Sequence, residues 1–164
     1  MAARLTLTLL ASCLALSACG MGGGDTPKAG EYSTDIKLVE IQMPGIDPSM
    51  KEQMQQMMPQ GQTACLTDEQ ITKGQWANAT DEMLKQMESG GQCKRIRDNN
   101  TATALDTQIE CTSPTDGTAT ITMTGKSTAD GMSAKMVTEG KDPKGEAMKM
   151  VVEINSKRLG DCKS

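Results

Sequence analysis

The chain has almost no aromatic residues and no histidine. Its 164 residues include one Trp, one Tyr and no Phe. The missing histidines exclude Ser-His and Cys-His catalytic arrangements. The scarcity of aromatics means that the core must be built from Met, Ile, Leu, Val and Ala. Because Met is flexible and specifies packing loosely, a small domain of this composition gains from covalent cross-links.

Several further features are missing, and each excludes a class of protein. No cluster of Lys and Arg is present and the net charge is −4, which argues against nucleic-acid binding. After the N-terminus, no apolar run is long enough to span a bilayer. No Gly-rich phosphate loop follows a predicted strand. We therefore expect a protein that is not an enzyme, holds no cofactor and binds no nucleic acid.

The N-terminus has the pattern of an export signal. Arg4 precedes an uncharged apolar segment from Leu5 to Leu16, and the sequence Leu16-Ser17-Ala18-Cys19 follows. This pattern resembles a bacterial lipoprotein signal, which implies a signal peptide at residues 1–18 and palmitate-type lipid on Cys19. The membrane link is then covalent, and Gly-rich residues 19–29 form a flexible tether. Gly20, rather than Asp, follows the lipidated Cys, and resemblance to the lipoprotein sorting rules of enteric bacteria then implies the periplasm-facing side of the outer membrane.

The cysteines predict a disulfide framework in an oxidising compartment. Cys13 leaves with the signal peptide and Cys19 carries lipid, so Cys65, Cys93, Cys111 and Cys162 remain. Four cysteines allow three pairings. We favour Cys93–Cys111, because these residues flank a predicted hairpin, and this choice leaves Cys65–Cys162.

Alternation of apolar and polar residues predicts antiparallel strands. The first strand runs from Glu31 to Met43, and its alternation changes phase after Leu38, which indicates a bulge or a bend. From Gln92 onward, apolar residues occupy every second position of successive segments, and turn signals separate these segments at residues 98–100, 114–117, 130–131 and 142–145. The pattern predicts a meander with one apolar face and one solvated, Thr-rich face.

Short helices are predicted between the first strand and the meander. One spans Thr67 to Lys73, where Thr67 and Gln70 form a capping box, and another spans Thr80 to Glu88. The Met-rich residues 46–64 form either a short amphipathic helix or a mobile loop. The predicted fold is α+β: a curved antiparallel meander of five or six strands with two or three short helices, disulfide-stapled, in a single domain at residues 30–164.

The methionines of residues 46–64 allow two interpretations. Met50, Met54, Met57 and Met58 recur at helical spacing, and thioethers are suitable ligands for Cu(I). Alternatively, the stripe packs on the sheet, as Met does throughout this chain. A flexible thioether surface also suits a small apolar ligand or an envelope protein partner. We expect a monomeric, lipid-anchored, periplasm-facing protein that binds a ligand or a partner, with Cu(I) binding as the alternative.

The landmarks of the chain resemble one bacterial family. They are Ala29-Gly30-Glu31-Tyr32, Met43-Pro44-Gly45, Cys65-Leu66-Thr67, Cys93, Cys111 and the ending Lys157-Arg158-Leu159-Gly160-Asp161-Cys162. Together they are similar to proteins that carry domain of unknown function 3617, and the resemblance covers about residues 29–162. Members commonly have Trp where this chain has Tyr32. The resemblance implies an envelope setting and transfers no catalytic residue.

Overall fold

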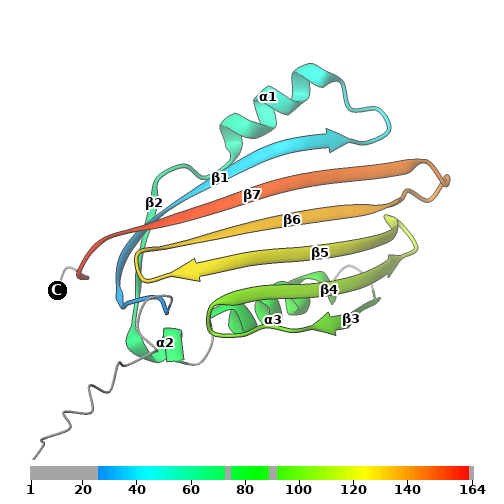
Figure 1. Cartoon of the computed structure of the whole chain (residues 1–164). Coiled ribbons are helices and arrows are strands. Elements are labelled where there is room, and N and C mark those ends of the chain that lie inside the picture. Colours follow the sequence, from blue (N-terminus) through cyan, green and yellow to red (C-terminus); the bar gives the residue numbers. More distant parts are fainter. Residues whose placement is uncertain (1–25, 73–74, 89–91, 163–164) are drawn as a thin grey trace, which may run out of the picture.

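The computed structural model describes residues 26–72, 75–88 and 92–162 as an open antiparallel sheet with three helices (Figure 1). The strands lie in the order β2-β1-β7-β6-β5-β4-β3. In chain order the elements are β1 Gly30–Gln42, α1 Pro48–Met57, β2 Gln62–Leu66, α2 Asp68–Thr72, α3 Gln75–Glu88, β3 Gln92–Asp98, β4 Ala104–Ser113, β5 Gly117–Thr128, β6 Gly131–Lys141 and β7 Ala147–Gly160. The C-terminal meander is confirmed, because β3 to β7 are neighbours in sequence order.

The sheet has seven strands, so the expectation of five or six was wrong. The strand that sequence reasoning missed is β2, whose residues before Leu66 are polar or small and all exposed. It pairs with β1 alone, along Gly30 to Thr34. A short edge strand with both faces in solvent has no hydrophobic alternation, which is the signal by which strands are found in a sequence.

Alternation along β4 and β5 places the main core on one face of the sheet. Four buried side chains form it, namely Leu105, Ile109, Ile121 and Met123. Helix α3 lies over this face, and Figure 1 shows it behind β3 and β4. Its residues Met83, Leu84 and Met87 pack on the buried cluster. The helix begins at Gln75, before the predicted Thr80, and α2 is only five residues long.

Charged and polar groups cap the start of α2 and hold α3 to the sheet. The predicted capping box is confirmed: Thr67 N donates to Gln70 Oε1 at 2.8 Å and Gln70 N donates to Thr67 Oγ1 at 3.3 Å. Arg95 on β3 donates to Asp81 on α3 and to Asp98. The hydrogen bond to Asp81 is the main cause that raises the pKa of Arg95. These contacts tie α3 to the edge of the sheet.

Strand β1 contains the predicted bulge, which changes the face of its side chains. Leu38 pairs with Val152 and Glu40 pairs with Val151, so one extra residue lies between them. Leu38 and Val152 are 2% and 4% exposed and form a second buried contact on the α3 side of the sheet. The phase change that the sequence shows after Leu38 therefore has a structural cause.

Helix α1 lies along the edge of β1 beyond the end of β2 (Figure 1). Of the two sequence alternatives for this segment, the helix is correct. Gln55 binds β1 from both sides, since its Oε1 accepts from Leu38 N at 2.6 Å and its Nε2 donates to Ile36 O at 3.1 Å. Lys51 Nζ donates to Val39 O at 2.6 Å. Side chains of α1 thus take the place of a neighbouring strand and protect the edge from pairing with another chain.

Two disulfides cross-link the domain. Cys93 pairs with Cys111 between β3 and β4, and Cys65 pairs with Cys162, which joins β2 to the C-terminal end. These are the bridges that the hairpin argument favours. The second bridge closes a loop with a sequence separation of 97, so it restricts the unfolded chain more strongly than the first.

Candidate functional site

The predicted signal peptide and the lipidation residue Cys19 lie outside the described residues. In the part of the chain that is described, no helix combines the length and the apolar character needed to cross a bilayer. The expected tether runs to residue 29, but its last residues pack on the domain. Pro27 is buried, and Lys28 N donates to Ala129 O at 3.3 Å. The folded unit therefore includes residue 27.

The family-like residues at the two ends of the chain meet at one end of the sheet. Arg158 donates to Ala29 O through Nε at 2.9 Å and through its terminal nitrogen at 2.8 Å, and to Asp161 at 2.5 Å. A Cβ on Gly30 would lie 2.3 Å from Gly160 O, so only glycine fits this close approach. We interpret these motif residues as a structural clasp.

Tyr32 completes this clasp. Its ring is 1% exposed, and its hydroxyl donates to Lys28 O at 2.7 Å. Burial raises the pKa of Tyr32 above its ordinary value of 10.0, although the positive charge of Arg158 opposes this shift. A neutral phenol that is already bonded to backbone has the properties of a packing group.

The methionines proposed for Cu(I) are split between surface and interface. Met50 and Met57 are 39% and 84% exposed, whereas Met54 and Met58 are half-buried. Helical spacing keeps Met50, Met54 and Met57 on one stripe, but Met58 follows the end of α1 in extended conformation. Packing on the sheet therefore accounts for part of the set only. Among the described residues, no group of three or more His, Cys, Asp or Glu is arranged to hold a metal ion.

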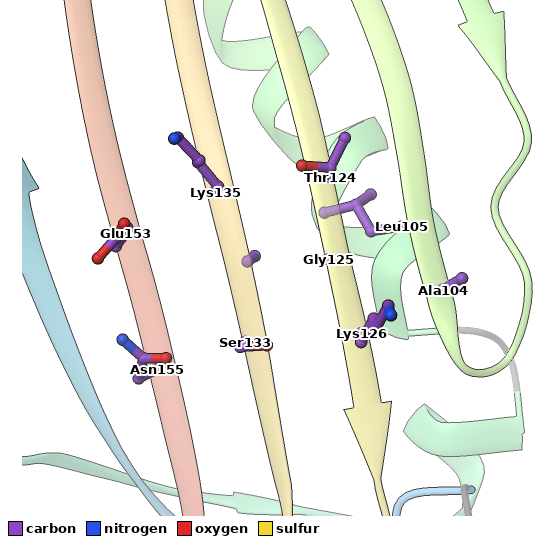
Figure 2. Close-up of a pocket in the computed structure, with 10 residues that line it drawn as sticks. Ala104, Leu105, Thr124, Gly125, Lys126, Ser133, Lys135, Glu153 and Asn155 are labelled. Carbon is purple, nitrogen blue, oxygen red and sulfur yellow. The ribbon is translucent and has the colours of Figure 1, made fainter.

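The largest hollows lie on the polar face of the sheet, opposite α3. One of about 540 Å³ crosses β4, β5, β6 and β7, and Figure 2 shows its lining residues. A second of about 560 Å³ reaches β1, and a third of about 1000 Å³ lies between β1 and α1. Asn155 lines all three hollows, so they adjoin there. We call their combined surface the polar groove.

The polar groove is a direct result of strand register. Lys126 pairs with Ser133, Ser133 with Asn155 and Asn155 with Asp35, so these four residues form a row across β5, β6, β7 and β1. Side chains at alternate positions project to the same face, which is the face opposite Ile121 and Met123. At about 4.8 Å between strands, the five strands from β4 to β1 give the groove a length of about 19 Å.

Small residues form the floor of the groove and charged residues form its sides. Figure 2 shows Lys126, Lys135 and Glu153 on the near side of β5, β6 and β7, with Ser133 level with Lys126 and Lys135 further along β6. Lys135 pairs with Glu153 across the strands, yet no ion pair within 4.0 Å joins them. The hydroxyl and amide groups of Ser133 and Asn155 likewise have no protein partner in the described part of the chain. Polar groups that lack partners are available to a ligand.

Sequence reasoning missed the polar groove because it treated the outward face as ordinary solvated surface. One signal was present: only Ala129 and Asp130 separate the paired residues Thr128 and Gly131. A hairpin this tight fixes the register, which places Lys126 opposite Ser133. The residues that β1 and α1 contribute to the polar groove depend on pairing between distant segments. The sequence therefore contains no comparable signal for them.

Residues 27–162 match the model of the family described as "Protein of unknown function (DUF3617)". No curated protein and no solved structure matches the chain significantly. The family match extends from the clasp residues at the start of β1 to the final cysteine, and it includes every described helix and strand. The chain therefore belongs to the DUF3617 family.

Proposed function

We propose that this protein is a lipid-anchored, periplasm-facing envelope protein whose domain binds a polar ligand in the polar groove without catalysing a reaction. The lipoprotein signal pattern that ends at Cys19 supports the lipid anchor and the periplasm-facing location, and Gly20 supports placement in the outer membrane. The observation that carries the binding function is the meeting of three hollows at Asn155, where the side chains of Asn155 and Ser133 have no protein partner in the described structure.

The unpartnered polar side chains of Ser133 and Asn155 favour a hydrophilic ligand over the small apolar ligand expected from composition. A hydrophilic molecule exchanges its hydrogen bonds with water for hydrogen bonds with Asn155, Ser133 and Gln56 of α1. An apolar molecule would leave those groups without partners, which costs free energy. The length of the groove suits an extended ligand that lies across the strands.

The absence of histidine from the sequence and the bridging of Cys65, Cys93, Cys111 and Cys162 support a non-catalytic role. A monomer is supported by the open edge of β3. This edge carries Lys94, Arg95 and Arg97, and its register shifts after Arg95. Positive charges and bulges on an edge strand oppose pairing with a second copy.

Native mass spectrometry tests the binding function directly. The protein is exported, purified without chelators and measured before and after denaturation. We expect a monomer with an adduct of a few hundred daltons that denaturation releases, and less adduct in Asn155→Leu than in a Thr112→Leu control on the same face outside the groove. An adduct held equally by both variants, or no adduct, contradicts groove binding.

Labelling with a radioactive fatty acid tests the anchor independently. The wild-type chain should incorporate label and fractionate with the outer membrane, whereas Cys19→Ser should incorporate none. Label in Cys19→Ser, or recovery of unlabelled wild-type protein in the soluble periplasmic fraction, contradicts lipidation of Cys19.

Cu(I) binding is the second candidate, and the exposure of Met50 and Met57 favours it because these thioethers are accessible. Competition with a chromophoric Cu(I) chelator tests it. We expect binding tighter than about micromolar that weakens in the double variant Met50→Leu and Met54→Leu, whereas the exchange of Met132 and Met136 for Leu on the opposite part of the sheet has no effect. Equal affinity in both variants contradicts a site on α1.

A further inference from the structure

Three lysines gather around Ser133 at the centre of the polar face. Lys126 on β5 is the cross-strand neighbour of Ser133, and Lys135 follows Ser133 by two residues on β6. Lys157 lies on β7, where it pairs with Gly131 of β6. Lys126 and Lys135 line one hollow, and Lys126 and Lys157 line the next. Both hollows also contain Ser133 and Asn155. The three lysines therefore occupy nearby positions on β5, β6 and β7 around these adjoining hollows.

Acidic groups near this lysine cluster form no ion pair with it in the described structure. Glu153, the cross-strand neighbour of Lys135, lines the same hollow but makes no ion pair within 4.0 Å. Lys126, Lys135 and Lys157 make no ion pair or side-chain hydrogen bond in the described structure. The carboxylate of Asp35, at the end of the same row, accepts a hydrogen bond from Gly61 N at 2.8 Å. Elsewhere on this face opposite charges do pair, as Lys149 does with Glu40 at 3.3 Å.

The lysine cluster opposes the overall charge of the protein. The chain carries 21 acidic and 17 basic residues, yet three of the basic residues line the two hollows that share Ser133. Like charges on neighbouring strand positions repel and destabilise the sheet. An anion bound between the ammonium groups removes this repulsion, and Lys binds phosphate well as a compact point charge.

We propose that Lys126, Lys135 and Lys157 bind the phosphate group of a soluble phosphorylated saccharide. The phosphate lies over Ser133, and the sugar hydroxyls bond to Asn155 and to the groove that continues towards α1. This inference rests on the proposed binding function and specifies the class of its ligand. The hydroxyl and amide lining distinguishes a saccharide from a bare ion, because it provides donors and acceptors beyond the charged site.

Isothermal titration of the purified, disulfide-bonded protein with glucose 6-phosphate tests the inference, with glucose as the uncharged probe. We expect glucose 6-phosphate to bind at least tenfold more tightly than glucose, and more tightly than inorganic phosphate. The pair Lys126→Gln and Lys135→Gln should weaken this binding at least tenfold. The control pair Lys141→Gln and Lys144→Gln, which removes the same charge at the opposite end of β6, should change it less than twofold.

Four other results would overturn the inference. Equal weakening in the two lysine pairs indicates a non-specific charge effect. Equal affinity for glucose and glucose 6-phosphate indicates a neutral ligand and leaves the groove function intact. Binding of phosphatidylglycerol vesicles through Lys126 and Lys135, without binding of glucose 6-phosphate, assigns the lysines to the membrane surface. Failure of every probe removes the phosphate site, while the native mass spectra still decide whether the groove holds a ligand.

Discussion

Replacement of Ile109 by Ala tests whether the core lies where β4 meets α3. Ile109 is 0% exposed and pairs with Ile121 in the buried cluster. The substitution removes three carbon atoms, worth about 2.4 kcal/mol at about 0.8 kcal/mol each. The remaining cavity raises the cost to about 3–4 kcal/mol. Because small domains are stable by about 5–15 kcal/mol, this loss is a large part of the total.

The matched control is Ile96→Ala on the neighbouring strand β3. Ile96 is 44% exposed, so the same change should cost less than about 1 kcal/mol, while the lost strand propensity is common to both variants. Urea unfolding of the oxidised protein, followed by far-UV circular dichroism, measures both costs. The denaturant slope should stay constant, and the midpoint should fall much further for Ile109→Ala than for Ile96→Ala. Equal losses in the two variants would refute the position of the core.

Three further predictions concern the clasp, the sheet edge and the disulfides. Tyr32→Phe should cost about 1 kcal/mol at neutral pH through its lost hydrogen bond. Because burial raises the pKa of Tyr32 in the folded protein, the unfolded chain loses its phenol proton at lower pH than the folded protein does. Wild-type stability should therefore fall as the pH rises above 10, and this fall should be smaller in the variant. Urea titration at each pH measures both. Gln55→Ala should speed amide hydrogen exchange at Leu38, because the Leu38 N–H donates to Gln55. Exchange in the β6–β7 pair should stay unchanged, and NMR measures both rates. Replacing both cysteines of the Cys65–Cys162 bridge by Ala should lower the free energy of unfolding by about 4.7 kcal/mol, and the same change at Cys93–Cys111 should lower it by about 3.2 kcal/mol. Urea unfolding measures both losses, and the reverse order contradicts the loop-entropy argument.

The sequence alone determined much of the meander and of the framework around it. Period-two alternation placed β4 to β7, because one face of each strand is buried and the other is not. Turn residues marked the hairpins, and the phase change after Leu38 marked the bulge. The capping box at Thr67 was equally readable, since it depends only on residues three apart.

Only the tertiary structure decided the features that depend on distant pairing. β2 became a strand by pairing with β1, although its own pattern shows no alternation. Gln55 and Lys51 found their function only when α1 lay along the edge of β1. The polar groove has the same origin: Lys126, Ser133, Asn155 and Asp35 come from four strands, and register alone brings them into one row. Local sequence specifies which side of a strand is buried, but the contacts between strands decide which exposed side chains become neighbours.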